Sequence, residues 1–258
     1  MPQDDIIARP SGGPDAHVLV GLDRSPLGES VLPHALALAR SCGARVTLLH
    51  VLEPDHHAEA TPTDPLAWEI RSAEGRHYLE TLAARHRARD LPIESVLIQG
   101  HAPEQIRDWA ASHHVDFTVL CTHGEGGRSE WNLASTTQKL IEGMAGSVLL
   151  VPASAPPAAS RELSYSRILL PVDGSVRAES VLPLATRIAR AQAAELVLAH
   201  VVAVPELTRI GPLTPEDLEL EQRVLHRNEA VGRAYLDRLR ARVAASGITV
   251  RAVLTPAN

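Results

Sequence analysis

The fold is decided by the stretch from Val115 to Pro152, VDFTVLCTHGEGGRSEWNLASTTQKLIEGMAGSVLLVP. A short apolar run, Phe117 to Leu120, ends at a glycine-rich loop, and a helical pattern begins near Ser135. A second apolar run, Val148 to Val151, follows the helix. This order predicts strand, loop, helix and strand, with backbone N–H groups of the loop and the helix N-terminus facing the strand ends. Such an arrangement suits an anion, most often a phosphate.

The residues before this stretch alternate apolar runs with helical patterns. Strands are predicted at 17–23, 46–52 and 93–98, and helices at 27–40, 66–87 and 103–113. Mostly apolar strands are typical of a sheet that is covered on both faces. Strands that alternate with helices predict right-handed parallel crossovers and an α/β fold with a doubly wound, open parallel sheet.

The beginning of the chain recurs further along. The sequence ESVLP at Glu29 to Pro33 returns as Glu179 to Pro183, and Asp23 returns as Asp173, each 150 residues later. Such a match at one constant offset indicates a tandem duplication.

The duplication divides the chain into four parts. We predict a flexible leader at 1–15, a first domain at 16–152, a linker at 153–164 and a partial second domain at 165–258. The linker is rich in Ala, Ser and Pro. The second copy ends after its third strand, at 248–254, and lacks the counterpart of residues 102–152, which hold the glycine loop and the last strands.

The leader contains Ser11-Gly12-Gly13-Pro14-Asp15, which resembles the SGGxD loop of the PP-loop ATP pyrophosphatases. In that family the loop follows the first strand, whereas here it precedes the first convincing strand. We therefore interpret it as part of the flexible leader.

Composition excludes several classes of protein. A net charge of −6 argues against nucleic acid as a partner, because phosphate backbones require a basic face. No apolar run approaches the roughly 20 residues of a membrane span, and the acidic N-terminus does not resemble a secretory signal. The chain has 2 cysteines, which predict free thiols in a reducing compartment, so we expect a cytoplasmic protein that does not contact a membrane.

We predict no metal site and no catalysis. Residues 53–59, EPDHHAE, have side chains that bind metals, but adjacent histidines on a loop rarely converge on one ion, so a solvated loop is expected. No catalytic base, metal cluster or nucleophile–base pair accompanies the glycine loop, which predicts a binding protein rather than an enzyme.

Both copies resemble the universal stress protein family. Ile168 to Ser175, ILLPVDGS, is similar to its opening strand and turn, and His50-Val51 and His200-Val201 are similar to the end of its second strand. Thr122-His123-Gly124 with Ser135 is similar to its loop. The resemblance implies a Rossmann-like sheet of five strands in the order 3-2-1-4-5. One branch of the family binds ATP through the motif G-x2-G-x9-G-[S/T], so the resemblance also implies ATP binding here.

That strand order leaves a crevice at the carboxyl ends of the first and fourth strands. The resemblance implies that adenosine lies against the ends of the first and second strands. It also implies that the phosphates lie beneath the glycine loop and at the start of the following helix. ATP, with Mg²⁺, is the implied ligand. The implied nucleotide-binding residues are Leu22, Asp23, Val51, Leu120, Cys121, Gly124, Ala134, Ser135 and Thr136.

The first copy departs from the ATP motif. It reads Cys121-x2-Gly124-x9-Ala134-Ser135, so two of the motif's glycines are replaced. The cysteine places a side chain where relatives let the ligand approach bare backbone. Glu125 adds a carboxylate that would repel phosphates.

Two of the implied residues have structural alternatives. Ser135 and Gln138 fit a capping box at the helix start. Asp23 can cap the turn into the first helix through Ser25.

Three functions remain open. The first is a stress-response protein whose first domain binds an adenine nucleotide as a sensor. The second is an interaction module without nucleotide, in which the edge strand at Val148 to Val151 pairs with a second copy to form a homodimer. The third, an ATP-cleaving or adenylating enzyme, rests on the leader loop and the shared fold alone.

Overall fold

The structure is a computed structural model that describes residues 16–54, 64–87, 91–122, 135–144, 146–152, 163–203 and 214–256. The chain divides into two compact units, Met1–Leu163 and Ser164–Asn258. The predicted leader at 1–15 and most of the predicted linker lie outside the described residues.

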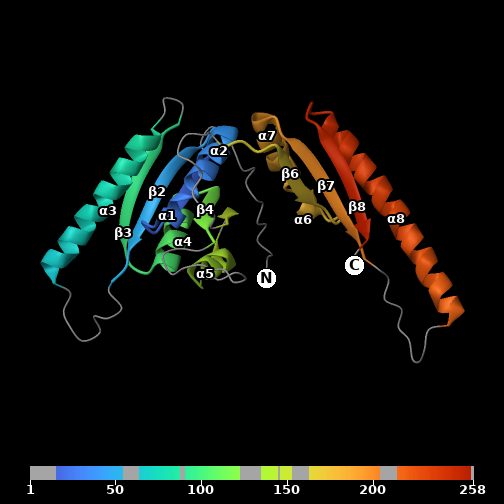
Figure 1. Ribbon diagram of the computed structural model, residues 1–258, viewed down its shortest axis with the longest axis horizontal. Coiled ribbons are helices and arrows are strands. Elements are labelled where there is room, and N and C mark those ends of the chain that lie inside the picture. Colours follow the sequence, from blue (N-terminus) through green and yellow to red (C-terminus); the bar gives the residue numbers. More distant parts are fainter. Residues whose placement is uncertain are drawn as a thin grey trace, which may run out of the picture. The chain divides into compact units, whose positions relative to one another are not determined.

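The first unit contains a parallel sheet of five strands in the order β3-β2-β1-β4-β5 (Figure 1). This order confirms the predicted doubly wound fold. β1 lies at the centre of the sheet, between β2 and β4. The strands are β1 (His17–Leu22), β2 (Arg45–Leu52), β3 (Ile93–Gln99), β4 (Phe117–Cys121) and β5 (Ser147–Val151).

Helices cover both faces of this sheet. One face carries α2 and α3, with the short α1 at the end of β1, and the other carries α4 and α5. Val18, Leu19 and Val20 in the central strand are consequently 0% exposed, as the apolar run predicts. The helices are α1 (Pro26–Glu29), α2 (Leu32–Cys42), α3 (Pro65–His86), α4 (Ala102–Ser112) and α5 (Ser135–Gly143).

The single helix predicted over 27–40 was wrong. The chain forms α1, breaks, and starts α2 at Leu32. Pro33 has no N–H, and its ring would collide with the carbonyl four residues earlier, so one continuous helix is excluded. Pro183 accompanies the same break in the second unit, between α6 (Val176–Glu179) and α7 (Leu182–Gln192).

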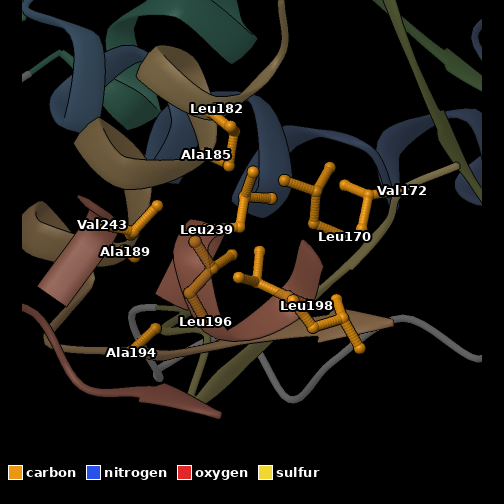
Figure 2. Close-up of a cluster of buried hydrophobic side chains, with 11 residues drawn as sticks. Leu170, Val172, Leu182, Ala185, Ala189, Ala194, Leu196, Leu198, Leu239 and Val243 are labelled. Atoms are coloured by element: carbon orange, nitrogen blue, oxygen red, sulfur yellow. The ribbon is translucent and has the colours of Figure 1, made fainter. Parts of the chain in front are cut away.

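The second unit contains a parallel sheet of three strands in the order β6-β7-β8. The strands are β6 (Arg167–Pro171), β7 (Glu195–Val202) and β8 (Val250–Pro256), and α8 (Pro215–Ala244) is the long helix of this unit. A cluster of aliphatic side chains fills the space between the sheet and helices α7 and α8 (Figure 2). Its members are Leu170, Val172, Leu182, Ala185, Ala189, Ala194, Leu196, Leu198, Leu236, Leu239 and Val243.

The other face of the second sheet is exposed. Leu169 is 65% exposed, whereas its repeat counterpart Leu19 is 0% exposed. Val201 is 56% exposed, whereas its counterpart Val51 is 8% exposed. In the first unit α4 and α5 cover these positions, and no helix in the described part of the second unit does so.

His17 is a buried polar residue at the start of β1. Its Nε2 lies 2.8 Å from Thr47 Oγ1, and its Nδ1 lies 3.2 Å from an Arg45 guanidinium nitrogen. A guanidinium only donates, so Nδ1 accepts and Nε2–H donates, which requires a neutral ring. The longer approach of Nδ1 to the His113 carbonyl, 3.4 Å, does not fit this tautomer as a hydrogen bond. Burial, followed by the positive charge of Arg45, lowers the pKa of His17.

None of the helices in the described parts of the chain has both the length and the apolar character needed to cross a bilayer.

Candidate functional site

The carboxyl end of β1 leads into α1 through a tight turn. Asp23 Oδ1 accepts hydrogen bonds from the backbone N–H of Ser25 at 3.0 Å and from Ser25 Oγ at 2.7 Å. Ser25 Oγ accepts in turn from the backbone N–H of Gly28 at 2.9 Å and caps α1. The capping role predicted as the structural alternative for Asp23 is therefore present. A ligand contact would be additional to it.

Arg24 occupies the middle of this turn in the left-handed region, with φ +67°. A residue with a side chain costs about 1 kcal/mol there. The second copy has Gly174 at the same place, with φ +85°. An Arg24 guanidinium nitrogen lies 3.4 Å from Glu74 Oε2 on α3, so the side chain extends toward that helix.

The end of β2 is joined to the end of β1 by a buried histidine. His50 lies opposite Leu22 in the strand register, and its Nδ1 lies 2.8 Å from the Leu22 carbonyl oxygen. A carbonyl only accepts, so Nδ1 carries the proton and donates. Burial is the main cause that lowers the pKa of His50, and the hydrogen bond to Leu22 opposes it. The imidazole is therefore mainly neutral at pH 7.

Three of the predicted nucleotide-binding residues have buried side chains. Leu22 is 5% exposed, Val51 8% and Leu120 5%. Val51 and Leu120 belong to the cluster that packs against Ile106 of α4. These side chains are part of the packed interior, so a ligand at the strand ends would meet the backbone groups of these residues.

Cys121 ends β4 beside the start of α5. Its carbonyl accepts a hydrogen bond from Thr137 Oγ1 at 3.2 Å, and Thr137 is buried. The Cys121 sulfur lies 4.0 Å from Ser30 Oγ, where α1 gives way to α2. Thr137 thus ties the first turn of α5 to the end of β4. Sequence reasoning missed this residue, because its only signal was a hydroxyl group near a helix start.

The remaining predicted phosphate contacts are not described. Gly124 and Ala134 lie outside the described residues, as does Glu125. Helix α5 begins at Ser135, but the side chains of Ser135 and Thr136 also lie outside the described part of the chain. The phosphate contacts and the capping box of Ser135 therefore stay predictions.

The described residues nevertheless bring three features to one edge of the sheet. β1 and β4 are neighbouring parallel strands, so the turn at Asp23 and the end of β4 at Cys121 lie at the same edge. The bond from Thr137 places the N-terminal turn of α5 there as well. The chain changes direction across the sheet between these two strands, which is where open α/β sheets bind ligands. Backbone N–H groups at a helix N-terminus favour an anion.

No group of three or more His, Cys, Asp and Glu side chains in the described ranges could hold a metal ion. Most of the loop at 53–59 lies outside those ranges.

A pocket of about 350 Å³ lies between the turn at Arg24, α1 and α3. It is lined by Arg24, Glu29, Glu74, His77, Tyr78, Thr81, Leu82 and Arg85.

Comparison with protein families gives matches to both copies. The model of the universal stress protein family matches residues 16–152 and 164–256. The comparison with curated proteins found no match.

Two solved structures that match most of this chain show the same fold. A universal stress protein from Archaeoglobus fulgidus DSM 4304 is 17% identical, with 94% of this chain and 77% of that chain covered and a TM-score of 0.65. A protein from Pseudomonas aeruginosa UCBPP-PA14, described as a universal stress protein, is 14% identical, with 95% and 75% covered and a TM-score of 0.56. A universal stress protein in complex with cAMP is 19% identical, with 54% and 98% covered and a TM-score of 0.37.

Proposed function

Because the chain belongs to the universal stress protein family, we propose that it is a cytoplasmic stress-response protein whose first unit binds an adenine nucleotide as a sensor. The observation that carries the proposal is the meeting of the Asp23 turn, the end of β4 and the N-terminal turn of α5 at the switch point of the sheet. An apolar interior with a few convergent polar groups at such an edge favours a small ligand with an anionic part.

The ligand proposed is ATP with Mg²⁺. The backbone at Leu22 and Val51 would face the adenosine, with Asp23 beside it. The N-terminus of α5, at Ser135 and Thr136, would face the phosphates together with Gly124. Cys121 is compatible with this placement of the adenosine and the phosphates, because its sulfur lies near Ser30 Oγ and its carbonyl accepts a hydrogen bond from Thr137.

We propose sensing rather than turnover because the polar side chains described at this edge have structural hydrogen bonds. The carboxylate of Asp23 accepts two hydrogen bonds from Ser25, and His50 donates to the Leu22 carbonyl. Both groups thereby hold the turn and the strand end in place, which is a structural task and different from the activation of a nucleophile that hydrolysis or adenylation requires.

The test is calorimetric titration of the protein with ATP in the presence of MgCl₂. Asp23→Ala and Asp173→Ala form a matched pair, because Asp173 makes the same turn bond to the Ser175 N–H, at 2.9 Å, in the second unit. We expect Asp23→Ala and Gly124→Asp to weaken binding by about tenfold or more and Asp173→Ala to leave it unchanged. Equal, negligible heat from the wild type and every variant would refute nucleotide binding. AMP or ADP after long incubation would refute sensing without turnover.

A second candidate function is self-association through β5. This strand lies at the edge of the five-stranded order, and the backbone N–H of Ser147 is bonded inward to Asp116. Since successive residues of a strand alternate, the N–H groups of Val148 and Leu150 point to the open edge. Open edges readily pair with a second strand.

The oligomeric state tests this candidate. We expect a dimeric mass by light scattering at micromolar concentration, and a monomeric mass for Val148→Pro, which removes one outward donor. A strictly monomeric wild type would exclude pairing at this edge without bearing on nucleotide binding.

A further inference from the structure

His50 controls the peptide group that leads directly into Asp23. The carbonyl that accepts from His50 Nδ1, at 2.8 Å, belongs to the peptide between Leu22 and Asp23. A peptide group is planar, so a hydrogen bond to its oxygen also restrains the orientation of the Asp23 N–H. The next bonds along the chain are those from Ser25 to the Asp23 carboxylate. The imidazole therefore anchors the first link of the turn that borders the candidate nucleotide site.

The second unit repeats this arrangement. His200 Nδ1 lies 2.7 Å from the carbonyl of Val172, and the residue after Val172 is Asp173. Asp173 Oδ1 accepts from the Ser175 N–H at 2.9 Å, as Asp23 does in the first unit. A bond from the second strand to the residue before the turn aspartate is thus present in both copies.

A glycine lies next to the imidazole in each unit, Gly75 on α3 and Gly232 on α8, and at Gly232 a side chain would crowd the ring. A Cβ at Gly75 would lie 3.6 Å from His50 Cδ2 and 3.1 Å from Leu97 Cδ1. A Cβ at Gly232 would lie 3.1 Å from His200 Cδ2. Glycine inside a helix costs about 1 kcal/mol relative to alanine, and at Gly232 this cost avoids a contact of 3.1 Å with the ring. His50 itself is buried, at 8% exposed, so its surroundings restrict the movement of the ring.

We infer that His50 is the positioning residue of the nucleotide site: its Nδ1–H holds the Leu22 carbonyl so that the backbone of Leu22 and the turn at Asp23 keep one orientation toward the adenosine. This inference rests on the proposed function. His50 does not touch the ligand in this role. It acts through the peptide group that the ligand meets.

The two copies separate positioning from folding. His200 makes the same hydrogen bond in a unit whose sequence contains no glycine loop. Loss of the bond in either unit removes a hydrogen bond between neighbouring strands, but only loss in the first unit disturbs the proposed site. His200→Leu is therefore the matched control for His50→Leu.

The conservative variant is His50→Asn. The amide nitrogen of asparagine can take the place of Nδ1 on the side chain and donate to the Leu22 carbonyl. His50→Leu removes the donor, and His50→Gln, whose amide lies one bond further out, is the second loss variant if the leucine variant does not fold.

The experiment measures the Kd for ATP in the presence of MgCl₂ and the ¹H–¹⁵N resonance of the Asp23 amide without nucleotide. We expect His50→Leu or His50→Gln to raise the Kd about tenfold, and His50→Asn and His200→Leu to leave it within about threefold of wild type. The Asp23 resonance should shift in the loss variants and return toward its wild-type position in His50→Asn.

Two results would overturn the inference. One is a loss variant that binds ATP as wild type does, and the other is a His200→Leu variant that weakens binding as much as His50→Leu. If the wild type itself binds no ATP, the proposed function fails separately. The Asp23 resonance then decides whether His50 orders the turn, and an unshifted resonance in the loss variants refutes it.

Discussion

Leu19 and Leu169 occupy the same position in the two copies but differ in burial, at 0% and 65% exposed. Replacing a fully buried leucine with alanine removes the transfer free energy of its side chain and leaves a cavity, at a cost of about 3 kcal/mol. Leu169 keeps only about a third of its surface in contact. Its share of the transfer free energy is about 0.5–1 kcal/mol, and removing it leaves no enclosed cavity. We predict that Leu19→Ala destabilises its unit several times more than Leu169→Ala destabilises the second.

Urea unfolding can follow the two units separately. The 3 tryptophans, Trp68, Trp109 and Trp131, all lie in the first unit, so tryptophan fluorescence reports on that unit. Far-ultraviolet circular dichroism reports on both. With a denaturant slope of about 2 kcal/mol per M, Leu19→Ala should lower the fluorescence midpoint by about 1.5 M. Leu169→Ala should leave that midpoint in place and move the remaining dichroism transition by about 0.5 M or less.

An equal loss of stability in the two variants would refute this reasoning. It would mean that the face bearing Leu169 is covered in solution as fully as the face bearing Leu19. Repeating the measurement at two protein concentrations then shows whether a second copy provides the cover, because only association makes the midpoint depend on concentration.

Two further predictions concern the buried His17 and the glycines of α3 and α8. The pKa of His17 is lowered because the ring is buried and faces Arg45. Below about pH 6.5 the unfolded state therefore binds more protons than the folded state, so the first unit loses stability as the pH falls through that range. The urea midpoint measured by fluorescence should fall when the pH is lowered from 8 to 5.5, and it should fall less in His17→Asn. A midpoint that rises on acidification would contradict this prediction. At the helix glycines, Gly75→Ala should be nearly neutral, because a gain of about 1 kcal/mol in helix propensity offsets the close contact with Leu97. Gly232→Ala should cost about 1 kcal/mol, because its Cβ would meet atoms at 2.9 and 3.1 Å, and thermal unfolding showing the reverse order would count against this packing.

Much of the fold was predictable because its signals are local. The alternating apolar runs and helical patterns predicted a doubly wound parallel sheet, and the constant offset between the copies predicted a smaller second one. The strand order 3-2-1-4-5 was implied by the resemblance to the universal stress protein family, and all three are observed. The helix break before Pro33 was missed, although its cause is also local. The apolar spacing continues through Pro33 and therefore has the pattern of one helix. The helix is nevertheless interrupted, because proline has no N–H to donate.

The candidate site was predictable only in part. Asp23 and Cys121 were placed at one edge because parallel strands end together, and the structure places them so. Their partners could not be predicted in the same way. His50 reaches the Leu22 carbonyl across 28 residues, and Thr137 reaches the Cys121 carbonyl across 16. These bonds depend on where the strands and α5 lie in space.

The sequence by itself determined the class of fold, the duplication and the family, because hydrophobic periodicity and repeated motifs are properties of residue order. Only the tertiary structure decided which of two equivalent leucines is buried, since burial depends on whether a helix covers that face of the sheet. It also decided that the imidazole of His50 reaches the Leu22 carbonyl beside the turn at Asp23, because a hydrogen bond between strands exists only once the strands are adjacent.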